Sequence, residues 1–481
     1  MGALMLRKAA ISLVVFIVLG VDGGPRAPET LGEKIEEIIE GEYARTAFWG
    51  IYVQDLDAGR LLYSRNAEKT LIPASNQKLL TTAAALDVLG SAYRYETTLH
   101  LDGQIQNTVL RGDLILEGSG DPTFGSQRFD QNDPLRHWAD SLAALGVTRI
   151  EGRIIGDDDI FDDNRYAQGW DITHIATRSF APARGGLSYR GNVVDLRIEA
   201  TRRGQPPTIE VEPAGYFDIV NQATTSARRR GPGPRLDRRV GTEAVRVYGA
   251  IPRAYRRTLG LPVSDPTAFT LHLFERYLRE AGIDVAAPLY DVDDLDEKPT
   301  YETATPLFVH TSPPLAEIVA VINKQSNNLY AEQVFHTLGW GGASAGGGAR
   351  VVETLARLGI PVKGLSVRDG SGLSRKDLVT PAAMGTLLAR MVEHDESEVF
   401  LNSLAEGGER GTTLPFRLRH LPIKGKTGSL EYVRALSGYT TTPDGRTLAF
   451  VVLANNYTAR SYRIEQAIDL IVETLATTQV G

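Results

Sequence analysis

Apolar residues near the start of the chain recur with two different periods. Residues 31–40 place four apolar side chains at the spacing of one helix face. Two apolar runs, 48–53 and 61–63, then flank a glycine-containing turn, which predicts a β-hairpin. A further apolar series begins after Pro73 and ends at Gly90, as expected for a helix with clear start and stop signals.

The pattern changes between residues 91 and 300. Short strand-like runs such as 114–116, 153–155 and 193–196 are separated by Gly, Pro and Asp. A helical pattern returns after Pro314. Two apolar runs, 436–439 and 448–453, then predict strands, and residues 462–475 predict a closing helix.

The two ends of the chain therefore share one α/β pattern that the middle interrupts. We predict an α/β (α+β) domain, an antiparallel sheet flanked by helices, built from residues 30–90 and 301–481. We predict that residues 91–300 form an inserted β-rich region of two nested domains. Insertions of this kind are tolerated where the two chain ends of the inserted domain lie close together.

Composition is that of a folded protein of more than one domain, with 481 residues, 42% hydrophobic and 23% charged. The net charge of −7 argues against nucleic acid as the main partner, because phosphate binding needs clustered Lys and Arg. The basic stretch 228–239 is broken by Gly and Pro. It is predicted to be a solvated loop, with contact to an anionic polymer as the alternative.

The N-terminus has the pattern of an export signal. Arg7 and Lys8 precede an apolar run over 9–21, which is shorter than a bilayer-spanning helix. We predict a signal peptide over residues 1–24, with an uncleaved anchor as the alternative, and hence a protein of the periplasm or the extracytoplasmic wall space. A loose association with the membrane or the cell wall is compatible with either reading.

The sequence Ser75-Asn76-Gln77-Lys78 could carry nucleophilic chemistry. Ser75 opens a predicted helix, and Lys78, three residues on, shares its face. A serine needs a nearby base to become a nucleophile, and a desolvated lysine can act as one. Ser-x-x-Lys arises often by chance, and taken alone Ser75 is better explained as a helix cap.

Two further motifs follow, Ser326-Asn327-Asn328 and Lys426-Thr427-Gly428. Ser326 offers a hydroxyl for proton relay, and Asn328 an amide that could hold a substrate backbone. Lys426 and Thr427 offer a charge and a hydroxyl for a substrate carboxylate, and Gly428 permits close approach to a strand edge. Each motif alone is also explained by a turn or a helix cap.

Together and in this order, the three motifs resemble those of penicillin-binding proteins and class A β-lactamases. Segments 112–123 and 369–375 resemble stretches of the low-molecular-mass class C penicillin-binding proteins, the D-alanyl-D-alanine carboxypeptidase/endopeptidase family. The long interval from Ser75 to Ser326 also fits that family, where it holds nested domains, whereas class A β-lactamases have a far shorter one. The resemblance covers nearly the whole chain beyond the leader.

The resemblance implies a penicilloyl-serine-transferase fold and a serine-type D-Ala-D-Ala carboxypeptidase acting on peptidoglycan stem peptides. Ser75 would be acylated, with Lys78 as base, and β-lactams would acylate the same serine. No metal or cofactor is implied. The residues it implies in substrate binding and catalysis are Ser75, Lys78, Ser326, Asn328, Lys426, Thr427, Gly428, Ser429, Leu373 and Arg375.

Within that set, the backbone N–H groups of Ser75 and Ser429 would form the oxyanion hole. Ser326 and Lys426 would pass a proton to the leaving D-Ala. Leu373 and Arg375 match family positions near the rim, where they would contact the side chain of the stem peptide's diamino acid. A tight turn with a surface arginine explains those two residues equally well.

The alternatives to a carboxypeptidase are a D,D-endopeptidase using the same serine and a non-catalytic wall-binding scaffold. Ser429 replaces a threonine that is common in relatives, and segment 181–192 matches loosely, which leaves side-chain preference open. Other enzyme classes fit less well. The Gly-x-Ser-x-Gly match at 342–346 lacks a preceding strand, no His-Glu-x-x-His zinc pattern occurs, and the carboxylates of 157–163 are predicted loop residues.

Overall fold

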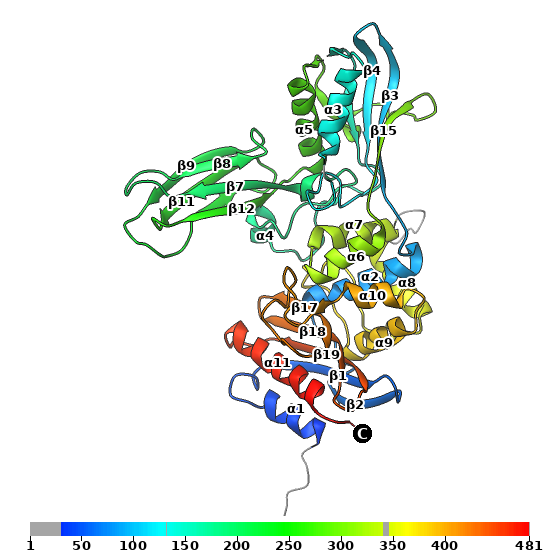
Figure 1. Ribbon diagram of the computed structural model, residues 1–481, viewed down its shortest axis with the longest axis vertical. Coiled ribbons are helices and arrows are strands. Elements are labelled where there is room, and N and C mark those ends of the chain that lie inside the picture. The colour runs from blue at the N-terminus through cyan, green and yellow to red at the C-terminus, as the bar shows by residue number, and fades with distance from the viewer. Residues whose placement is uncertain (1–29, 131, 340–345, 481) are drawn as a thin grey trace, which may run out of the picture.

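The computed structural model describes residues 30–130, 132–339 and 346–480. Figure 1 shows an elongated molecule, with a sheet-and-helix unit at one end, a second sheet at the other and a β-rich arm at the side. The predicted signal segment, and all but the last residue of the Gly-x-Ser-x-Gly match, lie outside the described residues. In the described part of the chain, no helix combines the length and apolar character needed to cross a membrane.

Strands from both ends of the chain form one antiparallel sheet in the order β16-β17-β18-β19-β1-β2. β1 pairs with β19 over eight residues, from Phe48 opposite Asn455 to Asp55 opposite Leu448. The strands are β1 (Phe48–Asp55), β2 (Arg60–Arg65), β16 (Ala405–Glu406), β17 (Ile423–Leu430), β18 (Val433–Thr441) and β19 (Thr447–Asn455).

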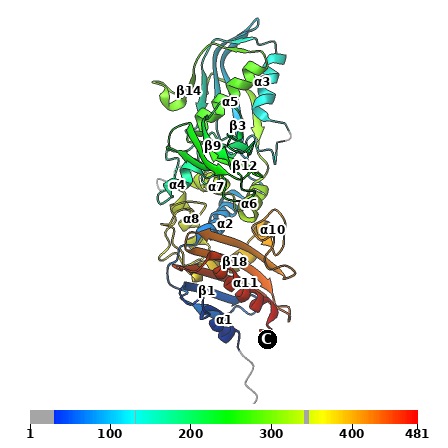
Figure 2. The same cartoon turned by 90° about the vertical axis from the view of Figure 1, so that its left-hand side faces the viewer.

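Helices cover both faces of this sheet, which explains the unbroken apolar run in β19. Val451 and Leu453 join the core on one face, and Phe450 and Val452 join the core on the other. The second core is closed by α1 (Leu31–Ile39), whose first turn is capped by Thr30, and by α11 (Ser461–Thr477). Figure 2 shows these two helices side by side over the sheet.

The helices of the opposite face pack around α2 (Gln77–Leu89), ten of whose thirteen residues are buried. Because the helix is surrounded by other elements, most of its side chains are shielded from solvent, and Lys78 is among them. The other helices of this group are α6 (Leu315–Lys324), α7 (Asn328–Gly339), α8 (Gly346–Arg357), α9 (Pro381–Val392) and α10 (Ser397–Ser403). We call this part and its sheet the six-stranded unit.

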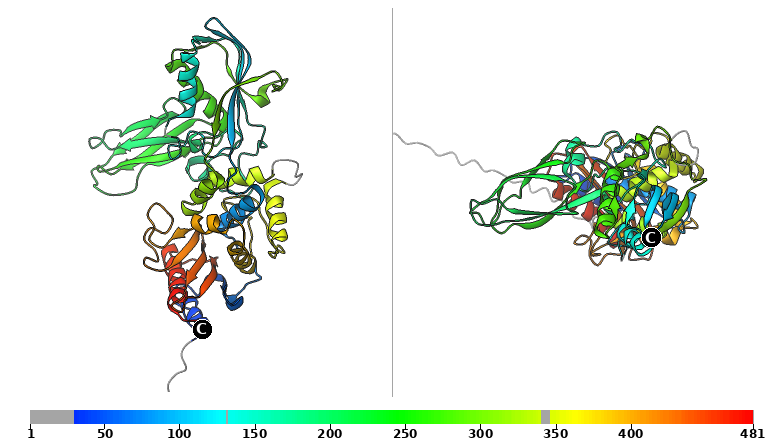
Figure 3. Two further views of the ribbon diagram at one scale, coloured as in Figure 1. Left: turned by 45° about the vertical axis from the view of Figure 1, so that its right-hand side comes forward. Right: turned by 90° about the horizontal axis from the view of Figure 1, so that it is seen from above.

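Residues between α2 and α6 form a second sheet with a core of its own. Its helices α3 (Pro134–Ala144) and α5 (Pro266–Glu280) pack together on the sheet (Figure 3). The strands are β3 (Glu96–Gln106), β4 (Val109–Glu117), β5 (Arg149–Ile150), β6 (Ile154–Asp157), β13 (Asp284–Val285), β14 (Leu289–Asp291) and β15 (Thr305–Thr311). β15 pairs with β3, so this sheet continues past residue 300. The domain boundaries at residues 90 and 300 remain predictions.

The arm consists of two three-stranded sheets, β12-β7-β8 and β10-β11-β9. Alternate residues of its strands, such as Val194, Leu196, Val245 and Val247, are buried between them. The strands are β7 (Val193–Glu199), β8 (Thr208–Glu212), β9 (Asp218–Thr225), β10 (Arg235–Arg238), β11 (Ala244–Ile251) and β12 (Arg256–Pro262), and the short helix α4 (Ile172–Thr177) lies at its base.

The prediction that 228–239 is entirely a loop was wrong for its last part. Residues 235–238 form β10, which pairs antiparallel with β11. Arg238 is buried there, its guanidinium donating to the Pro262 carbonyl and lying over the Phe217 ring. The Gly and Pro residues, 231–234, end before this strand begins, and Arg238 is buried by partners distant in sequence.

Candidate active site

Ser75 lies in a short 3-10 turn, η1 (Ala74–Asn76), that leads directly into α2. The turn is held in place from two sides. Ala74 has a positive φ of 48°, and its carbonyl oxygen packs closely on Gly372. A Cβ added at Gly372 would lie 1.9 Å from that oxygen. The Asn76 side chain donates to the backbone carbonyl of Lys426 at 2.9 Å. The serine is therefore fixed between two other segments of the chain.

The ammonium nitrogen of Lys78 lies 3.1 Å from Ser75 Oγ. It also donates to Asn328 Oδ1 at 2.6 Å and to the Ser371 carbonyl at 2.5 Å. The side chain is fully buried. Burial lowers the pKa of Lys78 to about 7, although the nearby carboxylates of Asp369 and Glu332 act in the opposite direction.

Three buried carboxyl groups shape the loop behind Lys78. Glu332 accepts from the backbone N–H groups of Gly370 and Ser371, and Asp369 accepts from those of Gly372 and Ser374. Asp377 accepts from the Arg368 N–H in the same loop. Burial raises the pKa of Glu332 to about 8 and that of Asp377 well above its ordinary value. These contacts hold the Ser371 carbonyl in place for Lys78.

Ser326 and Asn328 lie where α6 gives way to α7. Ser326 takes a positive φ of 60°, and its hydroxyl accepts from Lys426 Nζ at 2.9 Å. Asn328 stands at the start of α7, and its amide donates to the Phe180 carbonyl at 2.6 Å. Asn328 therefore connects the buried lysine to a segment of the insertion.

Lys426 is the second fully buried lysine of the site. Burial, and then the charge of Lys78, hold the pKa of Lys426 well below its ordinary value. Its strand, β17, pairs with β18 along its full length but with β16 only at Lys424 and Gly425. The stretch from Lys426 onward therefore presents a strand edge, and at Gly428 a Cβ would lie 2.8 Å from the Pro73 carbonyl.

A cleft of 560 Å³ opens above these groups. Of the residues that the sequence indicated, it is lined by Ser75, Ser326, Asn328, Leu373, Thr427 and Ser429. Lys78 and Lys426 lie beneath its floor and reach it through their serines. Arg375 is not in the lining; it is exposed and donates to the Glu431 carbonyl at 2.9 Å.

The insertion also contributes to this cleft, which sequence reasoning missed. His174 and Phe180 line it, and their rings are in edge contact. The Trp170 indole donates to Asp369 at 2.8 Å, and Ser374 Oγ donates to the Gln168 carbonyl at 2.6 Å. No local motif marks residues 168–180, whereas Glu332 and Asp369 lie within segments whose family resemblance could have drawn attention to them.

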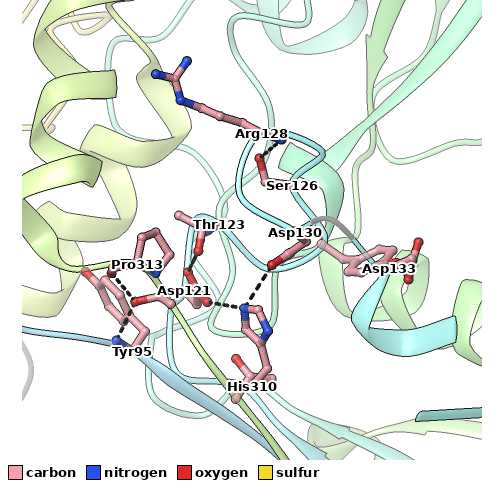
Figure 4. A network of polar contacts seen from close by, with 12 residues as sticks. Tyr95, Asp121, Thr123, Ser126, Arg128, Asp130, Asp133, His310 and Pro313 are labelled. Atoms are coloured by element: carbon pink, nitrogen blue, oxygen red, sulfur yellow. Dashed lines mark hydrogen bonds and ion pairs between the residues drawn. The ribbon is translucent and has the colours of Figure 1, made fainter. Parts of the chain in front are cut away.

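The segment 112–123 begins in β4, and its last residues lie near the joint between the insertion and the six-stranded unit rather than in the cleft. Figure 4 shows Asp121 and Asp130 converging on His310 of β15, with ion-pair distances of 3.5 Å and 3.8 Å. Thr123 donates to Asp121 through its N–H and hydroxyl, both at 2.7 Å. Nearby, the Tyr330 hydroxyl of α7 donates to Ser126 at 3.3 Å. The cluster around His310 lies within the insertion, and the Tyr330–Ser126 bond connects the loop beside it to the six-stranded unit.

The geometry assembles a serine, a buried lysine in contact with it and a second serine–lysine pair across one cleft. A lysine with a pKa near 7 is neutral in a large fraction of molecules at neutral pH and can accept a proton from the serine hydroxyl. The open edge of β17 offers backbone groups to an extended peptide. The arrangement suits acyl transfer from a peptide.

Comparisons with known proteins agree with this chemistry. The profile of the D-Ala-D-Ala carboxypeptidase 3 (S13) family matches residues 31–475. A D-alanyl-D-alanine carboxypeptidase from Actinomadura sp. (strain R39) is 33% identical over an alignment of 480 residues, which covers 94% of this chain and 87% of that protein.

Solved structures share the fold. Penicillin-binding protein 4 from Haemophilus influenzae superposes with a TM-score of 0.79 at 24% identity, over 92% of this chain and 99% of that one. A second structure of that protein is a complex with a β-lactam, with a TM-score of 0.75, 23% identity and coverage of 92% and 100%. A predatory peptidoglycan endopeptidase from Bdellovibrio bacteriovorus superposes with a TM-score of 0.51 at 17% identity, over 89% of this chain and 92% of that one.

The predicted fold class is confirmed by these likenesses. The family match spans both halves of the six-stranded unit and the whole insertion between them. It also includes each of the three motifs that meet at the cleft. This chain therefore belongs to the D-Ala-D-Ala carboxypeptidase 3 (S13) family.

Proposed function

We propose that this chain is a serine-type D-Ala-D-Ala carboxypeptidase that acts on peptidoglycan stem peptides through an acyl-enzyme on Ser75. The observation that carries the proposal is the contact of Ser75 Oγ with the buried, low-pKa amine of Lys78 at 3.1 Å. The family match and the 33% identical carboxypeptidase of Actinomadura support the substrate.

In the first step, neutral Lys78 takes the hydroxyl proton while Ser75 Oγ bonds to the carbonyl carbon of the penultimate D-Ala. The N–H groups of Ser75 and Ser429 stabilise the resulting oxyanion, and one such donor is worth about 3–4 kcal/mol. The C–N bond then breaks as Ser326, in contact with Lys426, delivers a proton to the departing amine, and the proton held by Lys78 replaces it on the Ser326–Lys426 pair. Water later cleaves the ester and regenerates the Ser75 hydroxyl.

In this proposal Thr427 and Lys426 bind the terminal carboxylate of the substrate, Thr427 from the cleft lining and Lys426 from beneath the cleft floor, and the peptide backbone runs along the open edge of β17. Asn328 holds the substrate backbone from the other side of the cleft, where it also contacts Lys78. Leu373 contacts the stem-peptide side chain within the cleft, with Arg375 at the rim. A β-lactam acylates the same serine and is released slowly.

The protein is proposed to act outside the cytoplasm, because the apolar segment after Arg7 and Lys8 is typical of an export signal and stem peptides are found there. The alternative to a released protein is one that an uncleaved leader attaches to the membrane or the cell wall. A fractionation of cells that express the full chain, compared with a variant lacking residues 1–24, tests export. Retention of both forms in the cytoplasm would contradict it.

The proposal is tested by intact-mass measurement after incubation with benzylpenicillin, with peptide mapping of the adduct. One penicilloyl group on Ser75 is expected, with none in Ser75→Ala and an unchanged adduct in the control Ser461→Ala. Labelling that persists in Ser75→Ala would refute the nucleophile. An unlabelled wild type that leaves the drug intact would instead indicate a scaffold.

The same preparations distinguish carboxypeptidase from endopeptidase. Diacetyl-L-Lys-D-Ala-D-Ala is expected to release free D-Ala with wild type and Ser461→Ala but not with Ser75→Ala. A cross-linked dimer of stem peptides, followed by chromatography, reports endopeptidase action. Cleavage of the dimer with no D-Ala release would replace the proposed activity by the endopeptidase alternative.

A further inference from the structure

The far end of the arm gathers an unusual concentration of positive charge. Residues 200–257 contain twelve arginines, no lysine and five acidic residues, in a chain whose net charge is −7. Most of these arginines lie in or beside three loops, 200–207, 226–234 and 252–255, and the loops themselves contain no acidic residue. The charge is therefore concentrated in three short stretches.

Strand directions bring those three loops together. β9 and β11 run parallel, so their last residues, Thr225 and Ile251, lie side by side at one end of their sheet. Backbone bonds connect the loops there, since Gly204 N–H donates to the Thr225 carbonyl and Arg253 N–H donates to the Arg228 carbonyl, both within 2.9 Å. We call this end of the arm the arginine tip; Figure 1 shows it pointing away from the body.

The arginine tip carries nine exposed arginines, and only one of them is in an ion pair within the described part of the chain. That pair joins Arg256 to Glu199 at 2.8 Å. The nine are Arg202, Arg203, Arg228, Arg229, Arg230, Arg235, Arg253, Arg256 and Arg257. Like charges gathered at one end of the arm repel one another, so the stability of the arm does not explain the cluster.

We propose that the arginine tip is a docking surface for a flexible, phosphodiester-linked polymer. Guanidinium groups bind phosphate oxygens in a fixed fork and do so better than ammonium groups, which fits a surface made of arginine alone. A polymer with one phosphate in each repeat can neutralise many of these charges at once, with release of its counterions.

Other polyanionic partners fit the arginine tip less well. None of the exposed large hydrophobic side chains in the described residues lies in its three loops, whereas helices and loops that insert into membranes use such side chains. Its loops contain a single aromatic residue, Tyr255, which packs on Gly233, so bases would find little to stack on. A phosphodiester chain with small, non-aromatic repeats needs neither feature.

The docking surface is separate from the cleft. Val193, at the base of the arm, lines a hollow together with Ser326. The seven residues of β7 run outward from there, which places Glu199 about 20 Å further from the site. Docking would therefore anchor the protein while leaving the cleft free, and this inference does not depend on the proposed catalytic activity.

The test measures binding of fluorescein-labelled poly(glycerol phosphate) to the full chain as salt is raised from 50 to 200 mM. The test variant is Arg228→Gln with Arg229→Gln and Arg230→Gln. The control variant has the same charge change on exposed arginines of the six-stranded unit, Arg45→Gln with Arg60→Gln and Arg390→Gln.

The test variant is expected to bind at least tenfold more weakly at 50 mM salt, with a salt slope shallower by about 2 for three lost contacts. The control is expected to bind like wild type, and penicillin labelling to be equal in all three proteins. Equal binding by the test and control variants would overturn the proposal. So would equally tight wild-type binding of poly-L-glutamate, of oligo(dT) or of anionic vesicles, each of which would assign the surface to another partner.

Discussion

The low pKa of Lys78 predicts how the acylation rate depends on pH. If Lys78 is the base, only its neutral form supports attack by Ser75, so the rate rises with pH. With a pKa of about 7, the neutral fraction climbs from about 9% at pH 6 to about 91% at pH 8, a tenfold increase followed by a plateau. A lysine with the ordinary pKa of 10.5 would be only about 0.3% neutral at pH 8, and its rate would still be rising at pH 9.

Asn328→Asp tests whether this profile belongs to Lys78. The substitution places a carboxylate where Oδ1 now lies, 2.6 Å from Nζ. An opposite charge at this range raises a lysine pKa by about 1–3 units. The acylation rate at pH 7 is then expected to fall about 5- to 500-fold and to recover as the pH is raised toward 10.

The assay measures the second-order rate constant for acylation by benzylpenicillin between pH 5.5 and 10. Samples are quenched at intervals and the acylated fraction is read from the intact mass, with a correction for hydrolysis of the free drug. Asn327→Asp is the matched control, because Asn327 accepts from the Tyr330 N–H and does not contact Lys78. Its midpoint should match that of wild type. A wild-type rate that is flat from pH 6 to 8, or an Asn328→Asp midpoint that does not move, would refute Lys78 as the base.

Three further predictions follow from particular contacts. Gly372→Ala should slow acylation at least ~100-fold, because its Cβ would lie 1.9 Å from the carbonyl of Ala74, the residue before Ser75. Gly445→Ala, at a similar φ of 82° with open space around it, should leave acylation unchanged; equal loss in both would contradict the steric reason. Burial disfavours the charged form of His310, but contacts with Asp121 and Asp130 outweigh it and raise its pKa above 6.5. The stabilisation that protonated His310 gives the folded state is present below pH 6.5 and is lost as the pH rises through the pKa of His310 in the folded protein. His310→Gln should therefore lower Tm more at pH 5.5 than at pH 8.5. Equal Tm losses would count against the ion pair. Lys78→Met should abolish acylation without lowering Tm by more than about 5 °C, because a buried lysine itself costs stability, and calorimetry checks this.

The insertion and the six-stranded unit are expected to act as one structure at the cleft. Phe180 and Trp170 of the insertion contact Asn328 and Asp369, both of which belong to the shell around Lys78. A change in the docking of the insertion would therefore reach Lys78 through these two bonds. The arginine tip lies at the opposite end of the arm from these contacts.

Much of the site could be predicted from the sequence alone. Motifs of three or four residues that begin at Ser75, Ser326 and Lys426 have a spacing and an order that already indicated the family and the chemistry. Hydrophobic periodicity also predicted the hairpin near the N-terminus, α2 and the strands of the C-terminal half, because burial on one or both faces leaves a regular trace.

Only the tertiary structure decided how these segments meet. The pairing of β1 with β19 and the burial of α2 bring Asn76, the neighbour of Ser75, into contact with Lys426 across 350 residues of chain. The same burial lowers the pKa of Lys78, and no property of the four-residue motif alone requires that. His174 and Phe180 reach the cleft, and the arginine tip forms, through contacts between residues distant in sequence. The local pattern of apolar and polar residues indicates which side chains of an element are buried. It does not indicate which distant segment packs against that element, because many apolar surfaces in one chain could pair.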